Sequence, residues 1–447
     1  MYIYTYTLCI SILIFFAYTK GEKMDFIQRN IAKKLEDITK SFSAVYLNGP
    51  RQCGKSTLVQ NLLPAKNVNY MTFDTTVIRT AAKKDPEAFI SSLPEDKINI
   101  IDEVQRVPVI QALILHRLFR KSKDGELFKN HSKTLFFITG SVSIFGLPSL
   151  ADIIIGKMPI LTLFPFSTAE TNNSKTNFIE KLWNEKLIIK NYQKIDLINT
   201  IKDATFPEIA LDKNMDRNVW MDGYIDTILE RDAVELAKIK KPELILQLLA
   251  SLCCRVGSLL NNDNVMSETG LNQITYDKYK SFCNNVFLTF EVQPWAKPNK
   301  LNKRFVKSKK IYFTDTNFLC FLLRRDISEI YKNDASFMGH IFENFIATEI
   351  MKSINTLPDK YYVSHFNPVR GDGKETDFIV EKDNGEVLAI EVKLDSTLSE
   401  KDFKNLETCR NIIGSKFKRG VVLYPGQDLV PFGENFWAVP VNFLWEG

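Results

Sequence analysis

The sequence predicts an α/β protein: a phosphate-binding loop on a parallel-sheet core, then a helical and winged-helix region, then a second α/β domain. Three observations predict this architecture. A glycine-rich loop follows the apolar run at residues 44–47, and two carboxylates follow another apolar run at residues 98–101. From residue 25 to 170, apolar runs alternate with helical stretches, as they do in a doubly wound sheet.

The glycine-rich loop contains the complete G-x-x-x-x-G-K-[ST] phosphate-binding pattern. Its glycines allow backbone N–H groups to turn toward phosphates, and the following helix adds the positive end of its dipole. We expect Lys55 to reach the β- and γ-phosphates of ATP and the Ser56 hydroxyl to coordinate Mg²⁺. The predicted ATP site is the whole loop: Gly49, Pro50, Arg51, Gln52, Cys53, Gly54, Lys55, Ser56 and Thr57.

Asp102 and Glu103 end the second apolar run. A parallel strand there delivers both carboxylates to the carboxyl edge of the sheet. We expect Asp102 to hold Mg²⁺ through water and Glu103 to polarise the attacking water. A third apolar run, at 134–141, places Thr139 or Ser141 at the same edge, where either could contact the γ-phosphate or the lytic water. The alternative is a strand that happens to end in acidic residues.

The composition indicates an ordinary globular protein. A length of 447 residues corresponds to roughly two to four domains, and 45% hydrophobic with 25% charged residues argues against disorder. The formal charge of +5 is small, so contact with nucleic acid would have to come from a local patch. The seven cysteines lack zinc-ligand spacing, which indicates reduced thiols and a cytoplasmic protein.

The first 23 residues form an extension of their own. Residues 2–18 are mostly apolar but lack the basic segment of a signal peptide. They are either a short membrane anchor that leaves the ATPase core in the cytoplasm or, as we favour, a stretch before a true start at Met24. The core is then expected over residues 24–172.

The middle of the chain is predicted to be a helical lid region at 173–246 and a winged-helix-like region at 247–325. In the second region, helices precede two strands, at 287–292 and 310–313, that bracket a basic hairpin. The hairpin at 297–310 either contacts DNA or RNA phosphates or is simply solvated. Its cations lie beside Trp295 and Phe305: Lys297, Lys300, Lys303, Arg304, Lys307, Lys309 and Lys310. The candidate recognition helix, around residues 275–282, carries only Lys278 and Lys280, which weakens the case for sequence-specific contact.

A second group of acidic residues lies in the predicted C-terminal domain, residues 326–447. Asp377 is expected on one strand of a hairpin, with Glu391 and Lys393 on the same face of the other. With Glu343 from the preceding helix, these residues have the D…E-x-K arrangement of restriction-endonuclease-like folds, in which carboxylates hold Mg²⁺ and a lysine orients the nucleophile. The alternative is an exposed hairpin with alternating charges.

Taken together, the sequence resembles the AAA-type P-loop ATPases of bacteria and archaea that carry a C-terminal restriction-endonuclease-like domain of unknown function. The resemblance covers about residues 26–426. It implies ATP hydrolysis coupled to remodelling of nucleic acid or a partner protein. Many AAA-type ATPases act as rings in which a neighbour supplies an arginine, so the oligomeric state, monomer or homo-oligomer, stays open. Its marks are GPRQCGKSTL, IIDEVQ, FITGS, LPSLAD, LERD, YFTDT, GHIFENF, ETDF and AIEVK.

One departure from this family concerns the arginine that acts on the transferred phosphoryl group. Lys157 stands where relatives usually carry an arginine, and a lysine lacks the planar fork of a guanidinium. Arg231 is the other candidate, unless it pairs with Asp232 or Glu235. Three functions stay open: a remodelling ATPase, an ATP-gated metal-dependent nuclease, and a nucleotide-dependent switch or scaffold with negligible turnover.

Overall fold

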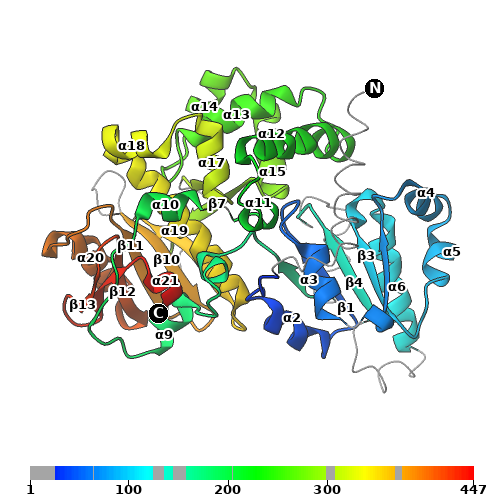
Figure 1. Ribbon diagram of the computed structural model, residues 1–447, viewed down its shortest axis with the longest axis horizontal. Coiled ribbons are helices and arrows are strands. Elements are labelled where there is room, and N and C mark those ends of the chain that lie inside the picture. The colour runs from blue at the N-terminus through cyan, green and yellow to red at the C-terminus, as the bar shows by residue number, and fades with distance from the viewer. Residues whose placement is uncertain are drawn as a thin grey trace.

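The computed structural model describes residues 26–63, 65–123, 135–143, 158–203, 205–297, 308–367 and 375–446. In Figure 1 the N-terminal sheet and its helices, coloured blue and cyan, lie on one side of the molecule. A second sheet, orange and red, lies on the other side, and green and yellow helices join the two above. The predicted extension at residues 1–23 and Met24 lie outside the described residues. Among the described residues, no helix is long and apolar enough to cross a membrane.

The N-terminal sheet has five parallel strands in the order β2-β3-β4-β1-β5, which confirms the predicted parallel α/β core. Helices cover both of its faces: Val45 and Leu47 pack with α2 and α3, whereas Tyr46 packs with α4, α5 and α6. The elements are α2 (Ala32–Thr39), β1 (Ala44–Asn48), α3 (Lys55–Leu62), β2 (Val68–Thr72), α4 (Thr76–Lys84), α5 (Pro86–Ser91), β3 (Ile98–Asp102), α6 (Val109–Lys123), β4 (Phe136–Gly140) and β5 (Ile160–Thr162).

The order of these strands sets the position of the predicted nucleotide site. Strand β4 lies between β1, which leads into the glycine-rich loop, and β3, which ends in Asp102. All three strands run parallel, so their carboxyl ends meet at one edge of the sheet. The loop, the two acids and Thr139 are therefore brought to the same edge.

Helices dominate the middle of the chain, residues 168–356. Several begin at a side-chain cap: Ser167 and Glu170 form a capping box at α8, and Asp216 accepts from the first turn of α12. After α12 the chain continues into a π-helix, η4 (Ile228–Leu236), which carries the LERD motif. The helices are α8 (Thr168–Thr171), α9 (Phe178–Asn184), α10 (Leu197–Lys202), α11 (Pro207–Leu211), α12 (Arg217–Thr227), α13 (Glu243–Cys253), α14 (Asn262–Thr269), α15 (Gln273–Asn285), α17 (Thr316–Leu323), α18 (Ile327–Asn333) and α19 (Ala335–Thr356).

The second sheet is mixed and has nine strands in the order β6-β13-β14-β12-β11-β10-β9-β7-β8. Hairpin β7–β8, from the region predicted to be winged-helix-like, pairs with this sheet through β7 and β9. Strands from both sides of the predicted domain boundary near residue 325 therefore belong to one sheet. The elements are β6 (Lys190–Asn191), β7 (Thr289–Pro294), β8 (Lys310–Phe313), β9 (Tyr361–Phe366), β10 (Thr376–Lys382), β11 (Val387–Val392), α20 (Lys404–Ile413), β12 (Phe417–Tyr424), β13 (Asp428–Pro431), β14 (Phe436–Pro440) and α21 (Phe443–Glu446).

A single hydrophobic core holds the helices and one face of this sheet together. It includes Phe178 and Leu248 from the helices and Phe378 and Val421 from the strands. A separate core under α20 covers the other face. Helix α19 is central to the larger core, and at its C-terminal end it reaches the N-terminal domain, where the Lys34 ammonium donates to the carbonyl of Asn355 over 2.9 Å.

Candidate nucleotide site and C-terminal acidic cluster

The glycine-rich loop has the backbone that its sequence requires. Gly49 and Gly54 have φ values of 147° and 93°, in the region that favours glycine, and Gln52 has a φ of 58°. A Cβ atom at Gly49 would lie 2.0 Å from the carbonyl oxygen of Leu163. Only glycine fits there, because the loop passes directly against the segment that follows β5.

The Lys55 side chain lies over its own loop. Its ammonium donates to the carbonyl oxygens of Gly49 and Pro50 over 3.0 and 2.7 Å, and the residue is buried. The Arg29 guanidinium supports the loop from outside by donating to the carbonyl of Cys53 over 2.9 Å. The loop therefore holds a buried ammonium group next to the N-terminus of α3, which is the place where phosphates bind in loops of this sequence.

Ser56 and Asp102 meet at the edge of the sheet. The Ser56 hydroxyl donates to Asp102 Oδ2 over 2.9 Å, and the Tyr70 hydroxyl donates to the same oxygen over 2.8 Å. Thr139 donates to the other carboxylate oxygen. Burial, together with the neighbouring Glu103 charge, raises the pKa of Asp102. A hydroxyl and a carboxylate are oxygen donors that suit Mg²⁺, so these residues fit the predicted ion.

Glu103 occupies a strained position directly after β3. Its φ of 56° is left-handed, and such strain in a non-glycine residue is typical of functional sites. Its carboxylate accepts from the Gln105 amide and, over 3.1 Å, from the Ser141 hydroxyl. Burial alone raises its pKa, but the charges of Arg51 and Lys55 outweigh burial and hold the pKa below its usual value. Glu103 is therefore ionised and able to accept a proton or orient water.

Thr139 and Ser141 were expected to contact the γ-phosphate or the lytic water. The structure places both at the predicted edge, where Thr139 donates to Asp102 and Ser141 donates to Glu103. In the described structure, these hydroxyls therefore orient the two acids. A direct contact with phosphate stays a prediction.

An ion pair that the sequence did not predict joins the loop to the π-helix. Arg51 Nε and Nη2 each lie 2.6 Å from a different oxygen of Asp232. The same guanidinium is 3.9 Å from Glu103 Oε2. The Asp232 side chain is 1% exposed, so the pair is almost completely removed from water. No local pattern indicated this contact, because its two residues are 181 positions apart.

The two candidate arginine-finger positions have different outcomes. Arg231 forms an ion pair of 3.4 Å with Asp74. The alternative role predicted for Arg231 was an ion pair with Asp232 or Glu235, and its partner is instead Asp74. Asp74 also pairs with Arg106 over 2.9 Å. The Arg231 side chain is 37% exposed, so its action on a phosphoryl group stays a prediction. Lys157 lies outside the described residues.

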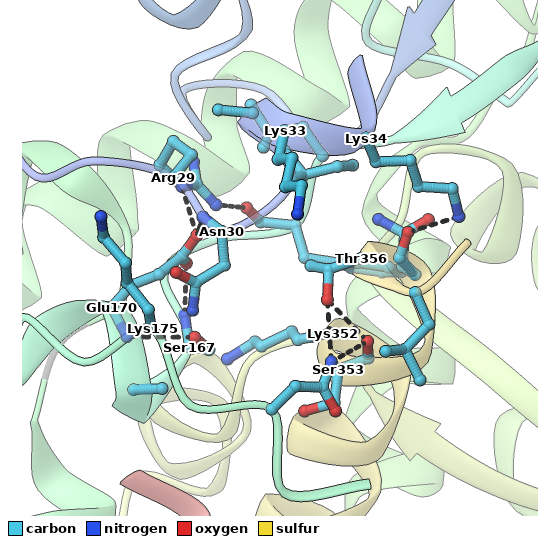
Figure 2. Close-up of a pocket in the computed structure, with 18 of the residues that line it drawn as sticks. Arg29, Asn30, Lys33, Lys34, Ser167, Glu170, Lys175, Lys352, Ser353 and Thr356 are labelled. Carbon is cyan, nitrogen blue, oxygen red and sulfur yellow. Dashed lines mark hydrogen bonds and ion pairs between the residues drawn. The ribbon is translucent and has the colours of Figure 1, made fainter. Parts of the chain in front are cut away.

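Figure 2 shows a pocket of about 1050 Å³ between α2 and the C-terminal part of α19. Arg29 pairs with Glu170 over 3.0 Å at one side, and Lys352 pairs with Glu349 over 3.0 Å. Both pairs are buried, and the backbone N–H of Thr168 donates to Glu349 over 2.9 Å. Two of the charge pairs that line the pocket thus lie within the protein, and through α8 they connect the glycine-rich loop to α19.

The C-terminal acidic residues come together as the sequence predicted, but around a lysine. The Lys310 ammonium lies 2.9 Å from Glu343 Oε1, 2.8 Å from Glu375 Oε1 and 3.4 Å from Asp377 Oδ1. Glu391 lies on the neighbouring strand, and its Oε1 accepts from the Lys393 ammonium over 2.8 Å. We call these residues the acidic cluster: Lys310, Glu343, Glu375, Asp377, Glu391 and Lys393.

A divalent metal does not fit the acidic cluster as it is arranged. Both carboxylate oxygens of Asp377 are engaged, one by Lys310 and the other by the Val392 N–H over 2.9 Å. In the ranges that the structure describes, no group of three acidic, histidine or cysteine side chains is arranged to hold a metal ion. Burial, with Glu343 and Glu391 nearby, raises the pKa of Asp377 well above its usual range. The predicted Mg²⁺ site at Asp377 and Glu391 therefore remains a hypothesis that requires a rearrangement.

Several lysines of the proposed nucleic-acid surface contact carboxylate or carbonyl groups of the protein itself. Lys309 pairs with Glu291 over 2.6 Å, and Lys280 of the candidate recognition helix pairs with the same carboxylate over 3.2 Å. Lys278 donates to the carbonyl of Lys238 over 3.2 Å. Lys297 is exposed. The remaining predicted residues lie outside the described part of the chain: Lys300, Lys303, Arg304, Phe305 and Lys307.

Family models match three parts of the chain. The model described as an AAA domain matches residues 41–172, and two described as Domain of unknown function (DUF8612) and Domain of unknown function (DUF4143) match residues 199–329 and 338–444. An uncharacterized protein of Mycobacterium tuberculosis is 24% identical over 419 residues, which cover 93% of this chain and 84% of that protein. An uncharacterized protein of Haemophilus influenzae is 23% identical over 407 residues, covering 86% and 89%.

Among solved structures, the chain is similar to a Walker-type ATPase of Pyrococcus abyssi, with 14% identity and a TM-score of 0.41, over 67% of this chain and 97% of that one. The AAA-domain match and the parallel sheet that carries the glycine-rich loop support a P-loop ATPase fold and nucleotide binding for residues 41–172. The endonuclease-like and winged-helix assignments stay predictions.

Proposed function

We propose that this protein binds ATP with Mg²⁺ in the loop at residues 49–57 and hydrolyses it. The observation that carries the proposal is the contact of 2.9 Å between the Ser56 hydroxyl and Asp102. It joins the loop to the acidic end of β3, so a nucleotide held by the loop has its phosphates beside both acids. Mg²⁺, when bound, neutralises phosphate charge that develops during transfer.

Each residue near the loop has a distinct task in this proposal. Lys55 leaves the carbonyl oxygens of Gly49 and Pro50 and donates to the phosphates, which are stronger acceptors because they are charged. Ser56 and Asp102 hold the ion. Glu103 is ionised in its buried position and orients the attacking water, with Ser141 and Gln105 fixing the direction of its carboxylate.

The ion pair between Arg51 and Asp232 supports a coupling between nucleotide and helices. Arg51 belongs to the loop, whereas Asp232 belongs to η4. A phosphate in the loop offers Arg51 an anionic partner besides Asp232 and Glu103. Binding or release of nucleotide therefore changes how strongly Arg51 holds Asp232 of η4. This is the route by which we propose that ATP rearranges the helical region against the rest of the protein.

The partner that such a movement acts on is proposed to be nucleic acid or another protein. The support for nucleic acid is the basic composition of residues 297–307. Lys309 and Lys310 do not add to it, because both form ion pairs within the protein. Phosphate release should then rise when DNA or RNA is added, and a neutral polymer of the same length should have no effect. The same rate with and without nucleic acid would favour a protein partner.

Nucleotide binding at this loop is tested by the Lys55→Ala variant. The proposal predicts that it loses saturable binding of a fluorescent ATP analogue, while its thermal unfolding without nucleotide stays close to that of the wild type. Lys33→Ala on α2 is the matched control, because this lysine is exposed and is not part of the loop at residues 49–57. Unchanged binding by Lys55→Ala would refute the assignment. Tight binding without any phosphate release would favour the nucleotide-dependent switch.

A further inference from the structure

The Lys310 ammonium stands where a metal ion would be expected among the carboxylates. An ammonium group has three N–H bonds to donate, and here three carboxylates lie within 3.4 Å of it, from Glu343, Glu375 and Asp377. The side chain is 4% exposed. The ammonium donates hydrogen bonds to Glu343 and Asp377 and lies at ion-pair distance from Glu375, so acidic groups from different parts of the chain surround this buried charge.

The surrounding contacts fix both the lysine and the acids. Tyr312, two residues along β8, donates to Glu343 over 2.5 Å. Strand β8 is held by β7, and β7 is held by β9 of the C-terminal sheet. The pairing of these strands therefore fixes Lys310 beside the acidic residues.

The acidic cluster keeps buried carboxylate oxygens that accept no hydrogen bond. Glu391 is 3% exposed, and its Oε2 has no hydrogen-bond partner among the described atoms. Its Oε1 is held by Lys393. Glu375 Oε1 likewise accepts no hydrogen bond. A buried carboxylate oxygen without a hydrogen-bond partner is costly, so the cluster retains two acceptors that a cation could use.

The Lys310 ammonium and a divalent ion compete for the same carboxylate oxygens of the acidic cluster. Mg²⁺ requires oxygen ligands at 2.0–2.1 Å, whereas the Lys310 contacts are 2.8–3.4 Å. Lys310 also occupies Asp377 Oδ1, which a metal would need. Two cations this close in a buried site repel each other strongly.

We propose that Lys310 is the resident cation of the acidic cluster, and that a divalent ion of the Mg²⁺ or Mn²⁺ class binds there only when this ammonium is removed. With the Lys310 ammonium in place, the acidic cluster does not bind a metal ion. This inference does not depend on ATP hydrolysis at the N-terminal loop.

Mn²⁺ binding to the full chain tests the proposal, with nucleotide removed and free Mn²⁺ followed by electron paramagnetic resonance. Lys310→Met should bind one more Mn²⁺ than the wild type, whose cluster should bind none. The additional ion should disappear in Lys310→Met combined with Glu391→Gln. Lys309→Met is the control, because it removes a charge from the adjacent position, where the partner is Glu291. A folded Lys310→Met protein that gains no ion would overturn the proposal.

A second measurement leaves Lys310 in place, and it decides the question even if Lys310→Met fails to fold. The thermal unfolding of the wild type and of Glu391→Gln is compared with and without Mn²⁺. The proposal predicts that Mn²⁺ shifts the melting temperature of both proteins equally. A Mn²⁺-dependent rise in the wild type that is absent from Glu391→Gln would show that the cluster binds metal beside Lys310, which contradicts the proposal.

Discussion

The guanidinium of Arg51 and the carboxylate of Asp232 form a bidentate pair with two contacts of 2.6 Å. One residue lies in the loop that leads into α3 and the other in the π-helix η4. π-Helical turns occur frequently at functional sites. The pair thus connects the proposed nucleotide site directly to the helical region.

Replacement of Asp232 by alanine should destabilise the protein strongly. The change leaves the Arg51 charge buried without its main partner, which typically costs about 3–5 kcal/mol. Unfolding in urea, followed by tryptophan fluorescence, measures the loss. The exposed Asp226 on α12 supplies the control, and its alanine variant should unfold like the wild type. Equal midpoints for both variants would mean that the pair contributes nothing.

Cys53 should be a slow thiol despite its position beside a helix N-terminus. Burial raises the pKa of the Cys53 thiol, and the thiolate is the reactive form. With iodoacetamide at neutral pH, mass spectrometry should find Cys254, which is exposed, modified well before Cys53. Modification of Cys53 first would contradict the buried position of its side chain.

The stability provided by Glu291 should depend on pH in a defined direction. Burial opposes its charge, but Lys309 and Lys280 together lower its pKa below the usual value. A carboxyl group with a lowered folded-state pKa stabilises the protein above its unfolded-state pKa, and this contribution disappears as the pH falls through the folded-state value. The free energy of unfolding of the wild type should therefore exceed that of Glu291→Gln by about 1 kcal/mol at pH 7. This difference should shrink below about pH 4.

Urea unfolding of both proteins at several pH values checks this dependence. Lys332 and Glu329 form an exposed pair on α18, so Glu329→Gln is a control with little effect at any pH. A difference between wild type and Glu291→Gln that grows as the pH falls would have the wrong sign for this account.

The parts of the site that are continuous in sequence could be predicted. The loop at 49–57 and the acids at 102–103 carry fixed spacings that follow from phosphate and Mg²⁺ chemistry, and the parallel sheet brings them to one edge. Long-range pairing could not be predicted in the same way. Arg51 was expected only as a loop residue, because nothing near it in the sequence indicates Asp232.

Lys310 shows the same limit for charged residues. The sequence placed it among the cations of a hairpin proposed to contact nucleic acid, and the acids at 377 and 391 in a separate metal site. The pairing of β7 with β9 brings both groups together in one buried cluster. A strand pattern indicates which residues share a face, but it does not show which other strand lies next to that face.

The most direct test of the proposed function is Mg²⁺-dependent phosphate release from ATP by the full chain, compared with Glu103→Gln. The substitution keeps the shape of the side chain and removes the charge that orients water. The account predicts that the variant binds ATP as tightly as the wild type and hydrolyses it at least about a hundredfold more slowly. Equal rates of phosphate release by the two proteins would contradict it.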